Sequence, residues 1–110
     1  MQQDDCLVVL VTVGSREDAG HIATTLVAER LAACVNIVGA IESVYWWEGR
    51  VHHDAEVLLI IKTRAAQWST LERRVRALHS YQNPEVIALP ITAGSQAYLD
   101  WVRGSTGTAD

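Results

Sequence analysis

The sequence predicts an α+β fold, a ferredoxin-like βαββαβ sandwich with one extended hairpin and a short C-terminal helix. Two observations support this prediction. Apolar, β-branched segments and segments of helical periodicity follow one another as strand, helix, strand, strand, helix, strand. The second and third strands are both long and are separated by a very short turn, so they are expected to pair as an antiparallel hairpin.

The first predicted strand covers 6–13, where "CLVVLVTV" is almost continuously apolar. Such a run is typical of a strand at the centre of a sheet. Ser15 then offers an N-cap, and apolar residues at helical spacing predict a helix that ends near Ala33.

The hairpin strands are predicted at 34–47 and 51–63, with a turn at 48–50 that contains Gly49. Glycine supplies the positive φ that a tight hairpin turn needs. Gly39 interrupts the first of these strands and is expected to mark a bulge or a bend.

The second half of the chain contains one more strand and two helices. A helix is predicted at 65–79 and a final helix at 95–103. The strand between them, 85–91, is bracketed by prolines, which confines it to a sheet edge or terminus. The segment "GSTGTAD" at 104–110, which has no large apolar residue, is expected to be a disordered tail.

Length and composition predict one domain, residues 1–103, because 110 residues with 49% hydrophobic content can build a core without a staple. The net charge of −4 argues against a nucleic-acid partner, which binds mainly through Lys and Arg. No apolar run approaches the length of a bilayer span, so no membrane partner is expected. The acidic, polar start "MQQDDC" lacks the features of a secretory leader, and a cytoplasmic location is predicted.

The hairpin itself predicts self-association. Strands of about 13 residues could reach about 40 Å, while a domain of this size has a radius of gyration of about 13 Å. Part of the hairpin must therefore project, and it carries Tyr45, Trp46 and Trp47. Exposed aromatic residues on a long hairpin invite aggregation unless another chain covers them, so these residues are expected at an oligomer interface.

The same hairpin holds candidate metal ligands. His52, Asp54 and Glu56 share one face of a strand, about 6.6 Å apart in sequence order. Imidazole and carboxylate groups suit Cu(II) or Zn(II), but three residues in a row on one strand do not converge on one ion. At most two could share a cation, with water or an adjacent chain supplying the other ligands, and the favoured alternative is a solvated polar edge without a bound ion.

Five segments, taken together, resemble the CutA family of divalent-cation tolerance proteins. They are "LAACVNIV" at 31–38, "SVYWWEG" at 43–49, "EVLLIIKT" at 56–63, "LHSYQNPEVIALPI" at 78–91 and "YLDWV" at 98–102. The resemblance implies a ferredoxin-like subunit in a homotrimer, a role in tolerance to copper and other divalent cations, no organic cofactor and no enzymatic reaction. It also implies weak binding of Cu(II) or another divalent cation near subunit boundaries.

The resemblance extends to particular residues. A copper site in a bacterial relative uses a cysteine near the end of the first strand and two adjacent histidines after the second helix. Here only His79 of that set is present. The loop after the second helix lies near a subunit boundary in such trimers, so Lys62, Tyr81 and Glu85 are expected to line an intersubunit cleft.

Two other functions stay open on the same fold. PII-type trimers sense nucleotides or other small ligands between their subunits, although the sequence lacks a glycine-rich phosphate loop. An acylphosphatase-like hydrolase needs an arginine-bearing phosphate loop after the first strand, and "TVGSRED" offers Arg16 without a glycine-rich cradle.

Overall fold

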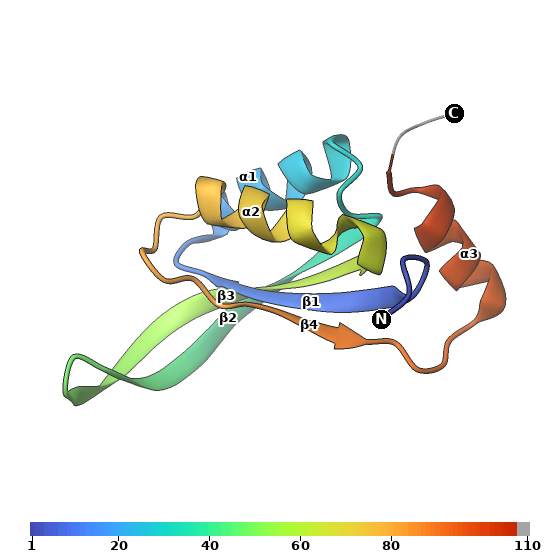
Figure 1. Ribbon diagram of the computed structural model, residues 1–110. Helices are drawn as coiled ribbons and strands as arrows, with labels where there is room; N and C mark the ends of the chain where they lie inside the picture. Colours follow the sequence, from blue (N-terminus) through green and yellow to red (C-terminus); the bar gives the residue numbers. More distant parts are fainter. Residues whose placement is uncertain (108–110) are drawn as a thin grey trace.

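A computed structural model describes residues 1–107, which fold into a four-stranded sheet with two helices on one face and a third at one end (Figure 1). The sheet order is β2-β3-β1-β4, and every neighbouring pair is antiparallel. The predicted ferredoxin-like sandwich is confirmed. Its elements, in order, are β1 (Cys6–Val13), α1 (Arg16–Ala28), β2 (Cys34–Trp47), β3 (Arg50–Arg64), the 3-10 turn η1 (Ala65–Gln67), α2 (Trp68–Leu78), β4 (Val86–Pro90) and α3 (Gln96–Gly104).

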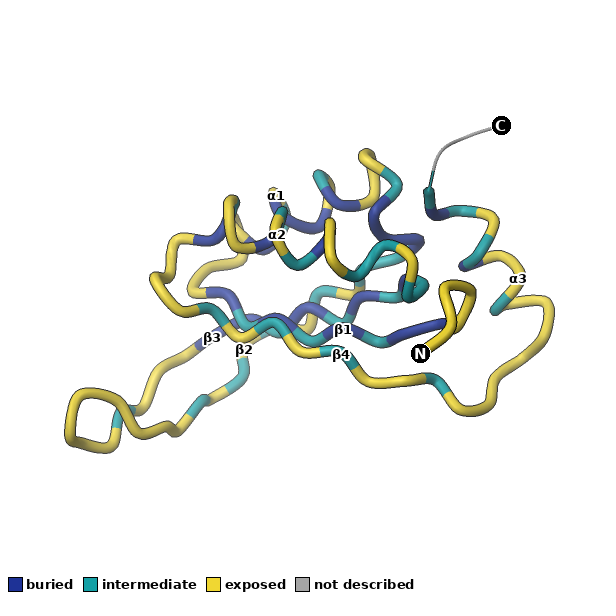
Figure 2. The backbone as a smooth tube through the Cα atoms, in the orientation of Figure 1, coloured by how far each residue is buried: buried dark blue, intermediate teal, exposed yellow. Residues whose placement is uncertain are grey.

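The core lies between the sheet and the two helices α1 and α2. Alternate residues of the central strand β1 face the helices because side chains alternate across a strand. Leu26 of α1 and Leu71 of α2 are fully buried against them. Figure 2 shows the buried parts of the sheet and of both helices in dark blue. The strand and helix residues that form it include Val9, Val11, Val13, Ile22, Leu26, Leu59, Ile61, Leu71 and Val75.

Within residues 1–107 no helix covers the opposite face of the sheet, which is also apolar. We call this surface the open face. Its central residue Leu10 lies opposite Ile60 on one side and Ile87 on the other. The apolar and small side chains of the open face are Val8, Leu10, Thr12, Val38, Leu58, Ile60, Ile87 and Leu89. Ile87 and Leu89 are each about half exposed in the single chain.

The β2-β3 hairpin projects beyond the helices, as predicted (Figure 1). The molecule measures 47 × 26 × 23 Å, and its radius of gyration of 14.4 Å exceeds the about 13 Å of a compact domain this size. Glu48 and Gly49 close the turn, both with positive φ. The predicted bulge is also present, since the pairing register shifts between Val38 and Ile41.

The first helix ends earlier than predicted, at Ala28 instead of near Ala33. Arg30 has a φ of 60°, a left-handed conformation that a non-glycine residue rarely adopts, and it breaks the helical path. The Leu31 amide then donates to the Leu26 carbonyl at 2.9 Å, which closes the helix end. Neither glycine nor proline marks this position, so composition gave no sign of it.

The expected disordered tail is wrong for residues 104–107. The Thr106 side chain is buried and its hydroxyl lies 3.0 Å from the Val102 carbonyl. The Arg30 guanidinium donates to the carbonyls of Gly104 and Gly107 at 3.0 and 2.6 Å, and the Gly107 amide returns a bond to the Arg30 carbonyl. The remaining residues of that prediction, 108–110, lie outside the described part of the chain.

No helix within residues 1–107 is long and apolar enough to cross a membrane. Cys6 is buried and Cys34 is half-buried, and both are free thiols.

Candidate functional site

A cleft of about 740 Å³ lies where the hairpin leaves the body of the molecule. We call it the hairpin cleft. The hairpin strands form one wall and the loop between α2 and β4 forms the other. Its charged lining residues are all carboxylates: Glu48, Asp54, Glu56 and Glu85. The other lining residues are Thr12, Ser43, Val44, Tyr45, Trp46, Trp47, Tyr81, Gln82 and Asn83. The cleft is therefore both acidic and aromatic, which favours a cationic occupant.

Glu56 and Tyr81 join the two walls of the cleft. The Tyr81 hydroxyl donates to Glu56 Oε2 at 2.8 Å, across 25 residues of sequence. Glu56 is only 8% exposed although it is a carboxylate. A Cβ at Gly14 would lie 3.0 Å from the Tyr81 hydroxyl, so the absence of a side chain there leaves room for the phenol. The contact between Tyr81 and Glu56 fixes the loop after α2 against β3.

Because of this contact, the stability of the folded state is expected to fall at alkaline pH. Burial first, and then the hydrogen bond to Glu56, raise the pKa of the Tyr81 phenol above its ordinary value. A group whose pKa rises on folding stabilises the folded state below its unfolded pKa, about 10 for tyrosine, and loses this effect as pH rises through the folded pKa.

We therefore expect Tyr81→Phe to lower the melting temperature at neutral pH, where the whole stabilising effect of the contact is present. The difference in melting temperature between wild type and variant should become progressively smaller above about pH 10. Circular dichroism melts across this range measure both quantities. A difference that stays constant at every pH contradicts the assigned role.

His52 and Asp54 are brought together by a third residue, Tyr45. The Tyr45 hydroxyl donates to Asp54 Oδ2, and its ring stacks on the His52 imidazole at a centroid distance of 5.4 Å. The bond to Asp54 raises the pKa of the Tyr45 phenol. Sequence reasoning placed Tyr45 at an interface and missed this second role. The predicted turn at 48–50 would have set Tyr45 opposite His53, whereas the observed turn has only two residues, Glu48 and Gly49, and sets Tyr45 directly opposite His52.

The His52 ring retains one nitrogen for a ligand. His52 Nε2 lies 3.0 Å from the Trp47 carbonyl, which only a protonated nitrogen can satisfy. The neutral ring then carries its lone pair on Nδ1. His52 and Asp54 together offer one imidazole nitrogen and one carboxylate oxygen from neighbouring positions on one face.

His79 is placed differently from the other candidate ligands. It is 8% exposed, and its two ring nitrogens are both engaged. Nε2 lies 2.7 Å from the Thr12 carbonyl, and Nδ1 accepts from the Tyr81 amide at 3.0 Å. Binding a metal through His79 requires the loss of one of these backbone contacts, so its arrangement favours a structural role.

Within the described residues 1–107, no three His, Cys, Asp or Glu side chains converge in a way that could hold a metal ion. Tyr81 and Glu85 line the hairpin cleft, and their predicted place between subunits stays a prediction. Lys62 lies outside it, six residues along β3 from Glu56, and donates to Asn36 Oδ1. Trp46 is 70% exposed, and its neighbours Tyr45 and Trp47 are also exposed, so they remain available for a partner chain.

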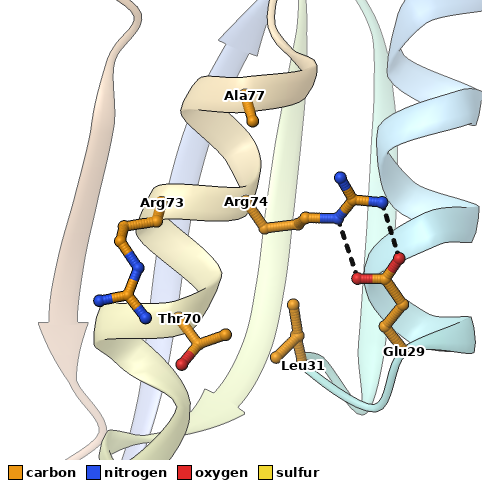
Figure 3. Close-up of a pocket in the computed structure, with 6 residues that line it drawn as sticks. All are labelled: Glu29, Leu31, Thr70, Arg73, Arg74 and Ala77. Carbon is orange, nitrogen blue, oxygen red and sulfur yellow. Dashed lines mark hydrogen bonds and ion pairs between the residues drawn. The ribbon is translucent and has the colours of Figure 1, made fainter.

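A second, shallower depression of about 450 Å³ lies between α2 and the turn after α1 (Figure 3). Arg74 Nε and Nη2 bind Glu29 Oε1 and Oε2 at 2.9 and 2.8 Å. The hydrogen bond from Arg74 lowers the pKa of Glu29. Arg73 points away from this pair and contacts Ser69. Because the ion pair already satisfies Arg74, this depression has less binding capacity than the hairpin cleft.

The fold and the cleft define a class of small ferredoxin-like α+β proteins that carry a projecting hairpin with an acidic, aromatic cleft at its base. Residues 7–105 match the model of the CutA1 divalent ion tolerance protein family. The chain belongs to this family, which is named for ion tolerance and not for a reaction.

Known relatives are similar to this chain in sequence and structure over most of its length. The divalent-cation tolerance protein CutA of Thermus thermophilus is 54% identical over 100 residues, which covers 91% of this chain and 97% of that one. Its solved structure superposes with a TM-score of 0.91 and 53% identity, covering 93% and 99% of the two chains. The solved structure of CutA1 from Oryza sativa gives a TM-score of 0.92 at 52% identity, covering 96% of each chain.

Some relatives are longer proteins. The chain is 55% identical over 100 residues to chloroplastic protein CutA 1 of Oryza sativa, covering 91% of this chain but 56% of that protein's length. The names of relatives also differ in compartment, since a solved relative from Archaeoglobus fulgidus is called periplasmic. A cytoplasmic location for this chain stays a prediction.

Proposed function

We propose that this chain acts in divalent-cation tolerance as a homotrimer that binds Cu(II) or another divalent cation weakly near its subunit boundaries, without catalysing a reaction. The observation that carries the proposal is that an uncovered apolar sheet face and an acidic hairpin lie next to each other. Membership of the CutA1 divalent ion tolerance family supports the cation class.

Self-association is supported by two surfaces that a single chain leaves in contact with water. The open face is an apolar sheet surface around Leu10 without a helical layer. The hairpin adds the exposed Tyr45, Trp46 and Trp47. Contiguous apolar patches of this kind mark protein interfaces, because burying them removes apolar area from water at about 25 cal/mol per Å². A ring of copies can bury both surfaces in every subunit.

Weak cation binding is supported by the two-residue donor set of the hairpin. His52 and Asp54 lie on the same face of β3, and Tyr45 contacts both side chains. Borderline cations such as Cu(II) and Zn(II) accept imidazole and carboxylate, but they need about four ligands in all. Water or an adjacent subunit must supply the rest, and an incompletely protein-built site binds weakly.

Calorimetric titration of the metal-stripped protein with Cu(II), Zn(II) and Cd(II) tests the cation site. We expect binding tighter than about millimolar for at least one of these ions, which corresponds to about −4 kcal/mol. His52→Ala and Asp54→Ala should each weaken it by about tenfold or more, because each removes one of two protein ligands.

His53 provides a matched control for this titration. It is adjacent to His52 but exposed on the opposite face of β3, so His53→Ala should leave the affinity unchanged. Equal losses for His52→Ala and His53→Ala would indicate diffuse surface binding. Failure of all three metals to bind below about millimolar would overturn the metal-binding part of the proposal.

A further inference from the structure

Two opposite charges lie at the two ends of the open face, and neither has an ionic partner among residues 1–107. Glu56 and Lys62 occupy even positions of β3 and therefore point to the same side of the sheet. Only Leu58 and Ile60 separate them on that side. Six residues of strand span about 20 Å, so the two groups of one chain cannot meet.

Lys62 lies near the C-terminal end of β3, and its described contacts are with neutral groups. Its ammonium donates to Asn36 Oδ1, and its cross-strand neighbours are Cys34 and Val8. No carboxylate within residues 1–107 forms an ion pair with it. Arg64, the next cation on that side, is already bound to Asp4. Lys62 is thus a cation without a counter-charge at the margin of an apolar face.

Glu56 presents the converse case at the hairpin end. It is 8% exposed, and its one described partner is the neutral Tyr81 hydroxyl on Oε2. No Lys, Arg or His lines the cleft that it faces, while Asp54 and Glu85 add further negative charge there. A buried carboxylate in this setting is strongly stabilised by a cation from outside the chain.

We propose that, in the assembled protein, Lys62 of one copy enters the hairpin cleft of the next copy and pairs with Glu56. The inference rests on the proposed self-association and adds the contact that sets its register. Cyclic rings with more than two members use head-to-tail interfaces, in which one end of a surface meets the other end of its neighbour. Burying the open face also removes Lys62 from water, and a buried ammonium is tolerated only when it is paired.

Charge exchange tests the pairing. Lys62→Glu and Glu56→Lys should each weaken association by about tenfold or more, because each places like charges together at the interface. The double variant Lys62→Glu/Glu56→Lys restores opposite charges and should recover most of the loss. Sedimentation velocity over a dilution series measures the assembly, and Arg73→Glu, a charge reversal on the helical side, should have no effect.

The oligomeric state of the wild-type protein distinguishes failure of the proposed self-association from failure of the Lys62–Glu56 pairing. A wild-type monomer at micromolar concentration refutes self-association and this pairing with it. A wild-type oligomer whose double variant assembles no better than the weaker single variant overturns the pairing alone. Should Glu56→Lys fail to fold by circular dichroism, carbodiimide cross-linking of the wild-type oligomer decides the question. A Lys62–Glu56 isopeptide detected by mass spectrometry must then join two copies, and its absence refutes the pair.

Discussion

Ile87→Asp is expected to prevent self-association at micromolar concentration while the subunit stays folded. Ile87 lies on the edge strand β4 and is 49% exposed in the single chain, so a carboxylate there remains in water when the subunit is alone. On burial of the open face the same carboxylate loses its hydration without gaining a cation, and the cost repeats at every interface of a ring. Light scattering gives the mass, and circular dichroism gives the fold.

Val27 supplies the matched control for this experiment. It is an apolar residue of similar exposure, 42%, on α1 at the other side of the molecule. Val27→Asp should leave the mass of the assembly unchanged. Dissociation by both substitutions would point to general destabilisation, and an unchanged mass for Ile87→Asp would show that the open face is not the interface.

Leu59→Ala is expected to lower the free energy of unfolding by about 2–5 kcal/mol. Leu59 of β3 is fully buried between the sheet and the helices, and its truncation removes apolar contacts while leaving a cavity. Urea unfolding at one fixed protein concentration measures the change, because association makes the apparent stability depend on concentration. Val27→Ala on the exposed side of α1 should change it by less than about 0.5 kcal/mol. A loss below about 1 kcal/mol at Leu59 would contradict its place in the core.

The strands could be predicted because their signals are local. The apolar run of β1, the paired prolines around β4 and the glycine of the hairpin turn each act through the conformation or burial of a few residues. The end of α1 could not be predicted, because Arg30 adopts a left-handed conformation for which arginine has no preference. Thr106 was misjudged for a related reason. Its segment has the composition of a tail, but Arg30 and Arg64 bind it from distant positions.

The candidate site was predictable only where it follows strand register. Alternation along β3 placed His52, Asp54 and Glu56 on one face, which the contacts of Tyr45 and Tyr81 support. The contact of Tyr81 with Glu56 depends on how the loop after α2 folds back, and no local pattern specifies that path. His79 was a candidate ligand only through the resemblance to the copper site of a bacterial relative. The structure shows that backbone groups occupy both of its nitrogens, which sequence alone does not reveal.

The central position of β1 has a consequence for biosynthesis. This strand is synthesised before the other three, yet one of its hydrogen-bonding edges is completed by β3 and the other only by β4, where Leu7 lies opposite Pro90. An apolar strand with an unpaired edge is the kind of segment that associates with other nascent chains. The segment from β1 to β4 must therefore be translated almost completely before β1 is protected on both edges.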